Sequence, residues 1–524
     1  MNKILTALLL FVVIYCRAGD IFVTSGGSLH DALRQAREWR RTNDPHCQGG
    51  ITIHVDTGRY YMQEPLFLRP EDSGTKESPL IIRGFAKSVI CGDVRQKHTQ
   101  LWPVIKQGQG LSQESMERII DFNTTDRTIT ISTPPDNVLQ DFLLKKTPLE
   151  MVVHQRWAIA ILRVKDMQVQ GDKTVVSFME PESRLEFEHP WPQPVIGGER
   201  GNSSFLLRTT EQRDGIEQLI VVDGANHVRF EGITIEQTCW NRPLHKGHVT
   251  LQGGFPLIDA YKLAVPGLPW DESLENQAWI ERPVSAVTVR NAHHVKFFSV
   301  TFQNLAATAL DFVDNISDCD VCECRFDNIG GTAIMGGSFA ESPREVHRPY
   351  TDLAERCQRM FFMGNFINNT ANEDWGAVAI ALGYVRDCLI SRNVVTHTNY
   401  SGICVGWGWT PLDTGMKNNR IIGNNIYDYA RQLYDAGGIY TLSNQPGSVI
   451  SDNKITAPYP APYATNDRGF RIYLDARTDG FTIENNYTGD IAPGIAGRPL
   501  TNQRPIRRDE IGDNHPGPNI IFKQ

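Results

Sequence analysis

The chain has 524 residues, of which 40% are hydrophobic and 21% are charged, and this length suits one large domain or about three of average size. Its 52 Lys and Arg and 60 Asp and Glu give a formal charge of −8 without any long block of like charges, which argues against a binder of nucleic acids or anionic membranes held by bulk charge. The 44 Gly and 29 Pro are too few for a disordered or collagen-like chain.

The first 18 residues have the pattern of a secretory signal peptide. Lys3 precedes an apolar run over residues 4–15, and small residues at Cys16 and Ala18 precede a cut before Gly19. The run is shorter than the ~20 apolar residues that a spanning helix needs, so a cleaved signal is favoured over a membrane anchor. We expect residues 1–18 to be removed and the mature protein to be secreted, without a membrane span.

Two regions precede the repetitive part of the chain. Residues 19–99 contain a helical stretch at residues 29–41 and strand-like runs such as residues 51–55, which predicts an N-terminal cap and the first coils of a repeat structure. Residues 100–205 alternate apolar and polar side chains without the period of the later repeats. We expect an inserted antiparallel β-rich lobe there.

Short β-rich runs recur over residues 206–490, each followed by Gly and Asn turns. Five turns carry an asparagine in the same position of the repeat: Asn365, Asn393, Asn424, Asn453 and Asn485. Parallel strands joined without helices, in coils of about 25 to 30 residues with an Asn turn in register, predict an all-β fold, the right-handed parallel β-helix. A β-propeller is the alternative, but its blades need about 40 or more residues each.

Two long segments interrupt the predicted coils, at residues 243–281 and 338–356. Loops of that length in a compact fold are usually functional or lid-like. The C-terminal tail, residues 491–524, is rich in Pro, Gly and charged residues, and we expect it to pack along the helix.

Nine cysteines remain after removal of the signal peptide, so they cannot all pair. Cys319, Cys322 and Cys324 have the look of a metal motif, but no second cluster follows at zinc-finger spacing. We interpret them as buried thiols in a strand-like segment and predict no metal site.

Carboxylates and aromatic side chains concentrate in the later coils, whereas the sequence has no phosphate-binding loop, dinucleotide fingerprint or serine-hydrolase elbow. Sugars present flat C–H faces and rims of hydroxyl groups, which favours aromatic platforms beside carboxylates. For each residue alone, packing or turn capping is the competing interpretation. The candidate substrate-binding residues are Asp374, Trp375, Trp407, Trp409, Tyr440 and Arg471.

Glycosidic cleavage requires two carboxyl groups in different protonation states. The following isoleucines align as equivalent strand positions of successive coils: Ile380, Ile403, Ile439 and Ile472. This alignment places Asp374, Asp435 and Asp467 near the starts of their strands, and Asp475 near the end of its strand. Coils stack about 4.8 Å apart, so carboxylates at neighbouring strand starts meet the ~5 to 9.5 Å separation of a glycosidase pair. Asp435 and Asp475 share a site only if Asp435 lies on a turn that folds toward the far end.

These coils resemble a known family. Residues 435–441, the Gln-Pro-Gly at residues 445–447 and the later Leu474-Asp475 segment are similar to the bacterial right-handed β-helix enzymes of glycoside hydrolase family 141, which include an α-L-fucosidase and a xylanase. The resemblance implies that Asp435 and Asp475 form the catalytic pair, with Asp467 as the reserve from the coil alignment. It also implies breakdown of plant polysaccharides in a bacterial periplasm.

Residues 151–163 and 275–280 match nothing that we can assign in that family, which leaves a subgroup with another substrate as an alternative. The leading hypothesis is a glycosidase that needs no cofactor and acts on a polysaccharide or its oligosaccharides. A polysaccharide lyase on the same fold is the second hypothesis, and it would use Arg468, Arg471 or Arg477, often with Ca²⁺. A non-catalytic carbohydrate-binding or adhesin β-helix is the third. The sequence makes no prediction of oligomeric state.

Overall fold

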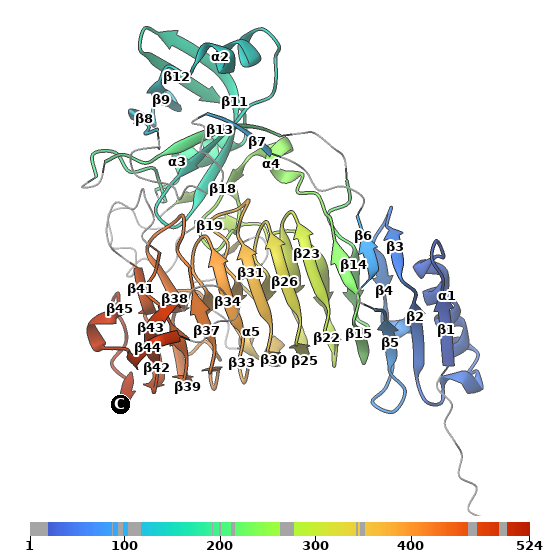
Figure 1. Cartoon of the computed structure of the whole chain (residues 1–524). Coiled ribbons are helices and arrows are strands. Elements are labelled where there is room, and N and C mark those ends of the chain that lie inside the picture. The colour runs from blue at the N-terminus through green and yellow to red at the C-terminus, as the bar shows by residue number, and fades with distance from the viewer. Residues whose placement is uncertain are drawn as a thin grey trace, which may run out of the picture.

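The computed structural model describes residues 19–85, 87–92, 98–102, 117–190, 192–198, 201–210, 215–262, 277–341, 344–345, 352–459, 469–491 and 500–523. Three long sheets, here called A, B and C, wind along one axis, so each coil contributes one strand to each sheet in turn (Figure 1). Neighbouring strands within these sheets are parallel, apart from the last pair of sheet B. The predicted all-β parallel β-helix is therefore confirmed.

Sheet A begins at the N-terminal end of the helix and ends with the last strand of the chain. Its strands in spatial order are β1 (Gly19–Val23), β2 (Ile51–Val55), β5 (Leu80–Arg83), β15 (Val228–Glu231), β22 (Lys296–Phe298), β25 (Ile316–Cys322), β30 (Cys357–Met363), β33 (Leu389–Ser391), β36 (Arg420–Ile422), β39 (Asn444–Ser451), β42 (Asp479–Glu484) and β46 (Ile521–Lys523), with β21 (Ala292–His293) beside β25.

Sheets B and C follow the same progression. Sheet B contains β3 (Gly58–Tyr61), β6 (Ser88–Cys91), β16 (Thr234–Glu236), β23 (Thr301–Leu305), β26 (Arg325–Ile329), β31 (Phe366–Thr370), β34 (Val394–Thr398), β37 (Asn425–Tyr427), β40 (Lys454–Ile455), β43 (Tyr487–Ile491) and β44 (Leu500–Pro505). Sheet C contains β4 (Leu66–Leu68), β14 (Ile220–Asp223), β20 (Ser285–Arg290), β24 (Thr308–Phe312), β27 (Ile334–Gly336), β32 (Ile380–Leu382), β35 (Ile403–Val405), β38 (Ala436–Thr441), β41 (Gly469–Leu474) and β45 (Ile511–Asp513).

The core consists of columns of identical or similar side chains that stack from coil to coil. In sheet C the register pairs Ile380 with Ile403, Ile403 with Ile439, and Ile439 with Ile472, as the coil alignment predicted, and all four side chains are buried. Burying one such side chain stabilises the fold by about 1.5–3 kcal/mol. Because side chains alternate between the faces of a strand, fixing this inner column also fixes which residues face outward.

An asparagine ladder occupies the turn between sheets A and B. The side-chain amide of Asn393 donates to Asn424 Oδ1 over 2.9 Å, and that of Asn424 donates to Asn453 Oδ1 over 3.0 Å. The ladder ends at Asn486, which accepts from Asn453 over 2.9 Å. The predicted member Asn485 is wrong, because this residue adopts a positive φ of 52° in the turn. Asn485 and Asn486 are adjacent, so the sequence alone does not decide which of the two continues the ladder.

Helix α1 (Leu29–Arg41) covers the first coil at the N-terminal end (Figure 1). Ser28 caps the helix by accepting from the backbone of Asp31 over 3.1 Å, and Leu29, Leu33 and Ala36 face the core at helical spacing. The helix spans the residues that the sequence predicted. It shields the edge strands that would otherwise offer unpaired backbone groups to other chains.

A separate antiparallel sheet projects from the coils, above them in Figure 1. Its strands are β7 (His98–Trp102), β13 (Phe205–Thr210), β10 (Glu150–His154), β11 (Ile159–Gln170), β12 (Lys173–Phe178), β9 (Thr128–Ser132) and β8 (Asp121–Asn123), with the helices α2 (Asp136–Leu143) and α3 (Glu182–Glu188). The chain enters and leaves it through β7 and β13, which pair with each other. The predicted inserted lobe is therefore present.

The two long interruptions of the coils meet each other. After α4 (Arg242–Lys246), the short strand β17 (His248–Val249) pairs with β11 of the lobe. The strands β18 (Leu257–Lys262), β19 (Gln277–Ile280), β29 (Arg344–Glu345) and β28 (Ala340–Glu341) form one small sheet, and α5 (Leu353–Arg356) leads back into β30. These insertions build walls above sheet C.

Residues 500–523 are part of the solenoid. They supply the last strands of all three sheets, β44, β45 and β46, so this segment adds backbone pairing rather than only packing along the outside.

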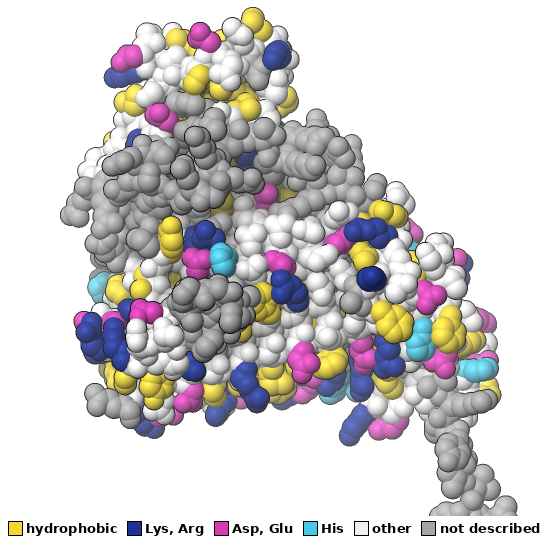
Figure 2. All heavy atoms as spheres, viewed as in Figure 1, with side chains coloured by type: hydrophobic (Ala, Val, Ile, Leu, Met, Phe, Trp, Pro, Cys, Tyr) yellow, Lys and Arg dark blue, Asp and Glu magenta, His cyan; other side chains and the backbone are white. Residues whose placement is uncertain are grey.

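Acidic and basic side chains intermingle along the lower edge of the β-helix (Figure 2). Within the described part of the chain, no helix is long and apolar enough to cross a membrane.

Candidate active site

The candidate site lies on the outer face of sheet C, where β35, β38 and β41 lie side by side. The register pairs Cys404 with Tyr440, and Tyr440 with Tyr473. These three side chains form the column next to the buried isoleucines, so they point out of the helix interior. The rings of Tyr440 and Tyr473 meet edge to face with centroids 5.2 Å apart.

Asp435 immediately precedes β38 and has a positive φ of 63°, a backbone conformation that few non-glycine residues adopt. Its Oδ1 accepts a hydrogen bond of 2.9 Å from the hydroxyl of Tyr473 on the neighbouring strand. Tyr400, which precedes β35, donates to the backbone carbonyl of Asp435 over 2.9 Å. Two tyrosines from neighbouring coils therefore fix this half-buried aspartate.

Asp475 immediately follows β41 and is held through both carboxylate oxygens. The Tyr440 hydroxyl donates to Oδ2, and the Asn514 side-chain amide donates to Oδ1 over 2.7 Å. Tyr440 and Tyr473 thus connect the two aspartates although these occupy opposite ends of their strands. The hydroxyl of Tyr473, a residue near the end of β41, reaches Asp435 at the start of β38, and this bond links the two ends.

The electrostatics of the tyrosines reflect both carboxylates. Burial, reinforced by the negative charges of Asp435 and Asp475, raises the pKa of Tyr400 and the pKa of Tyr440 well above their usual values. Both phenols therefore stay protonated near neutral pH and act as hydrogen-bond donors.

A small pocket opens beside Tyr400 and Tyr440. Its walls are apolar, with Phe255 and Phe339 from the two insertions and Trp407 from the turn after β35. The Trp407 ring lies 5.2 Å from Phe255 and 5.1 Å from Phe339 between centroids. The volume of the pocket is about 30 Å³, room for about two ordered waters, so it is a small apolar recess beside the two tyrosines.

The predicted Trp pair is only partly at this pocket. Trp407 lines it together with Tyr440, whereas Trp409 is absent from its lining. The two indole rings are stacked with centroids 6.3 Å apart, and both side chains are buried. Trp409 therefore contacts the pocket wall through Trp407.

Asp374 and Trp375 lie elsewhere. Asp374 is buried and accepts from Nε2 of His248 over 2.9 Å, beside a second cavity. Trp375 stacks on His154 of the lobe strand β10 with ring centroids 4.6 Å apart. The structure thus gives Trp375 a docking contact with the lobe.

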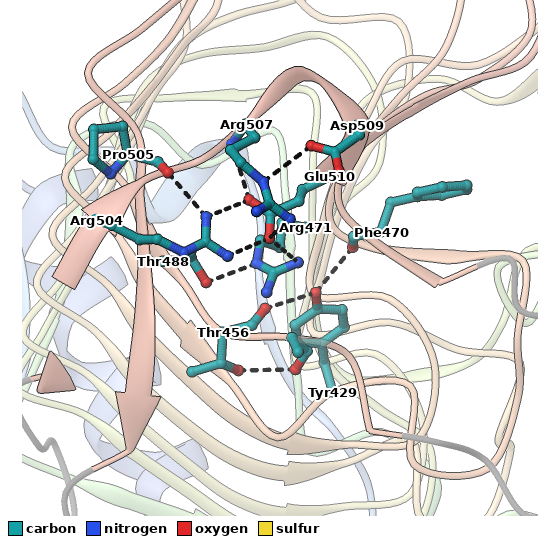
Figure 3. Close-up of polar contacts among 11 residues, drawn as sticks. Tyr429, Thr456, Phe470, Arg471, Thr488, Arg504, Pro505, Arg507, Asp509 and Glu510 are labelled. Atoms are coloured by element: carbon teal, nitrogen blue, oxygen red, sulfur yellow. Dashed lines mark hydrogen bonds and ion pairs between the residues drawn. The ribbon is translucent and has the colours of Figure 1, made fainter. Parts of the chain in front are cut away.

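Arg471 belongs to an ion cluster near the C-terminal end of the helix (Figure 3). It donates to Thr488 Oγ1 over 2.6 Å and pairs with Glu510 over 3.1 Å. Two hydrogen bonds from Arg504 lower the pKa of Glu510 to about 2. Arg471 therefore joins β41 to the last coil and is not brought to the carboxylate pair.

Asp467 and Arg468 lie outside the described residues. Sequence analysis did not select the supporting residues Tyr400, Tyr473 and Asn514. For Tyr473 a signal existed, because the coil alignment that pairs Ile439 with Ile472 also pairs Tyr440 with Tyr473. Asn514 lies in a segment without the repeat period, so nothing in the sequence connected it with Asp475.

The candidate metal motif lies on the opposite part of the coil. Cys319 is buried on β25, and Cys324 is buried two residues after the end of this strand. Burial raises the pKa of each thiol to about 12. Thiols with so high a pKa are poor ligands at neutral pH, because metals bind the thiolate.

Comparisons with known proteins agree with this architecture. A family profile described as "GH141 insertion domain" matches residues 89–213, and one described as "Right handed beta helix region" matches residues 362–515. A solved structure described as a glycoside hydrolase is 30% identical, with a TM-score of 0.81 over 96% of both chains. The fold and this match define a right-handed β-helix glycoside hydrolase. With the family's insertion domain in its lobe, the chain belongs to glycoside hydrolase family 141.

Two further solved structures have TM-scores below 0.5. A GH136 lacto-N-biosidase from Eubacterium ramulus is 10% identical, with a TM-score of 0.37 over 96% of this chain and 67% of that one. The adhesin PfbA from Streptococcus pneumoniae is 11% identical, with a TM-score of 0.33 over 94% and 92% of the two chains. Comparison with curated protein sequences gave no match.

Proposed function

We propose that this protein is a secreted glycosidase that cleaves glycosidic bonds in a complex plant cell-wall or algal polysaccharide, or in oligosaccharides derived from it, with Asp435 and Asp475 as the catalytic pair. The observation that carries the proposal is the linkage of both aspartates through Tyr440 and Tyr473 on the outer face of sheet C. The sugar whose bond is cleaved would lie over the outer face of sheet C beside Tyr440, at the mouth of the small apolar pocket. An α-L-fucosidase-like specificity and a periplasmic location follow from the family resemblance.

The hydrogen bonds suggest different roles for the two carboxyl groups. Both oxygens of Asp475 accept from neutral donors, Tyr440 and Asn514, and such bonds favour the ionised form. We assign Asp475 as the ionised partner, which acts as nucleophile or as base toward water. Asp435 then acts as the general acid that protonates the leaving oxygen, since cleavage needs one protonated carboxyl group.

Catalysis on this assignment involves the protein's own residues only. Trp407 and the neighbouring phenylalanines exclude water from one side of the pocket, and Tyr473 holds Asp435 in place while the proton passes to the leaving group. Tyr440 and Asn514 hold Asp475 on the other side of the bond to be broken. Positioning of this kind contributes to the rate because the groups need not reorganise during the reaction.

A lyase on the same fold receives less support. Arg471, one of the three arginines considered as a lyase base, is engaged by Glu510 and Thr488. Hydrolysis and elimination also differ in their products, because only elimination leaves an unsaturated sugar. Absorbance of the products therefore separates the two activities.

The test is incubation of the purified mature protein with a panel of plant and algal polysaccharides and their oligosaccharides, followed by mass analysis of what is released. The same assay is run with Asp435→Asn, Asp475→Asn and Asp467→Asn. We expect the first two variants to lose about 10²–10⁴-fold in rate and the third to keep measurable activity. Full activity of Asp435→Asn would contradict the proposed mechanism. Loss in Asp467→Asn with activity kept in Asp475→Asn would exchange the second partner.

A further inference from the structure

A second cavity lies beside the pocket of Tyr440. It has a volume of about 220 Å³, roughly fifteen times the ~15 Å³ that one ordered water needs. Small residues border it at the starts of β24 and β27, namely Ala306, Ala307 and Gly331, and α4 contributes to its other side. Larger side chains at these places would fill the space.

A buried polar pair lines this cavity. The side chains of Asp374 and His248 are only 7% and 2% exposed, and Asp374 Oδ2 accepts from His248 Nε2 over 2.9 Å. Asp374 Oδ1 accepts from the backbone of Gly376 over 3.1 Å. Each carboxylate oxygen has room for two hydrogen bonds, so Asp374 retains capacity to accept from the hydroxyl groups of a ligand. Burial of this pair costs free energy of folding because the two groups lose their hydration. Such a cost is expected where the buried groups bind a ligand.

The two arginines at the cavity are paired with carboxylates. Arg242 pairs with Glu281, and Arg282 forms two hydrogen bonds of 2.6 Å with Asp311. The indole of Trp240 forms part of the wall, edge to face with His248 at 4.7 Å between centroids. A neutral ligand with many hydroxyl groups and one apolar face matches this lining better than an anion does.

The two cavities meet at one turn. Gly253 borders both of them, and Gly253 and Gly254 have positive φ angles of 58° and 79°. A Cβ on Gly253 would lie 3.7 Å from Trp407, whereas a Cβ on Gly254 would lie 2.8 Å from the Asp374 carboxylate. The turn without side chains therefore touches the aromatic wall of one cavity and the acidic group of the other.

Resting on the proposed function, we propose that this second cavity binds a non-reacting sugar unit of the same substrate. Because the two cavities meet at Gly253, the reacting unit and the bound unit would belong to one oligosaccharide. Asp374 accepts hydrogen bonds from hydroxyl groups, and Trp240 packs against the C–H face. The protein thereby selects an oligosaccharide over a single sugar.

The test uses saturation-transfer NMR on the double variant Asp435→Asn, Asp475→Asn, with D-xylose, L-arabinose, L-fucose, L-rhamnose, D-galactose and D-glucose as probes. We expect transfer to at least one of these sugars. Adding Ala307→Leu, which fills the cavity without removing a polar group, should abolish a transfer that the size-conserving control Ala307→Ser keeps. Asp374→Asn serves as the second variant if Ala307→Leu does not fold.

Kinetics supply an independent readout in the active enzyme. Ala307→Leu should raise KM for the oligosaccharide found in the substrate panel and leave the hydrolysis of an aryl glycoside of its reacting sugar unchanged. No transfer to any of the six sugars, or transfer that survives both Ala307→Leu and Asp374→Asn, would overturn the proposal. Sugar binding at this cavity without hydrolysis of any panel member would instead contradict the glycosidase function and leave the binding site in place.

Discussion

Tyr473 supports Asp435 across the boundary between two strands, with a hydrogen bond of 2.9 Å, and stands only two residues before Asp475 on its own strand. One strand, β41, therefore carries one carboxylate and the support of the other. A shift of this strand against β38 would disturb both aspartates at once, because Tyr440 reaches back from β38 to Asp475. The positions of the two candidate catalytic aspartates are therefore coupled through β38 and β41.

The first prediction concerns this support. Tyr473→Phe removes the donor to Asp435 but keeps the ring and its packing, so we expect kcat to fall by about 10-fold or more with little change in melting temperature. The exposed cap residue Tyr61 gives a control, Tyr61→Phe, with parental kinetics. A fall in melting temperature without a fall in kcat would assign Tyr473 to packing alone.

The second prediction separates the two aspartates by the leaving group. In Asp435→Asn, a poor leaving group lacks its proton donor, whereas a 2,4-dinitrophenyl group departs without one. The rate ratio between 2,4-dinitrophenyl and 4-nitrophenyl glycosides should therefore rise in Asp435→Asn. In Asp475→Asn both rates should fall together. The opposite pattern would exchange the two roles.

The third prediction compares two tryptophans. Trp407→Leu opens the wall of the pocket beside Tyr440, so we expect a higher KM. Trp375→Leu removes the stacking contact with His154 of the lobe, so we expect a lower melting temperature and an unchanged KM. Equal effects of both substitutions on KM would show that the lobe contact and the pocket are not separable.

The fourth prediction concerns the asparagine ladder. Asn424→Ala and Asn453→Ala each remove a buried amide that bonds its neighbours, and each should lower the free energy of unfolding by about 1–3 kcal/mol. Asn485→Gly is the matched control, because Asn485 has a positive φ that glycine also adopts. Thermal melts decide the point, and unchanged melting of both Ala variants would remove the ladder as a source of stability.

The fifth prediction is a pH dependence of stability. Burial lowers the pKa of His154 from 6.5 to about 3, so the unfolded chain takes up this proton at a higher pH than the native protein does. The stabilisation from this residue is complete above pH 6.5 and is lost as the pH falls toward 3. At pH 5 the free energy of unfolding has decreased by about 2 kcal/mol from this residue. Urea unfolding at pH 7 and pH 5 should show a smaller loss for His154→Gln than for the parent protein.

Much of this fold follows from repetition in the sequence. The isoleucine columns predicted the register of sheet C, because each coil places the same residue type at the same inward position. The Asn ladder was predicted except at its last member, where two adjacent asparagines leave the choice to backbone conformation. Residues 500–523 lack the repeat period, so their addition of strands to three sheets was not predicted.

The candidate site was less accessible to sequence reasoning. Asp435 and Asp475 came from the family resemblance, and spacing alone placed them at opposite ends of neighbouring strands. Their connection depends on the turn at Asp435 and on two tyrosine hydroxyl groups, which are three-dimensional features without a local signature. Trp375 and Arg471 were selected for their residue types, but their contacts with His154 and Glu510 depend on segments distant in the chain.

The two strands at which the chain enters and leaves the lobe lie side by side. Its first and last strands, β7 and β13, are hydrogen-bonded neighbours in which Leu207 faces Trp102, so the chain departs from the coils and returns to them at nearly one point. A lobe of another size or shape can occupy this position without changing the register of any coil. The lobe can therefore change in size over evolution while Asp435, Asp475 and their tyrosines keep their places.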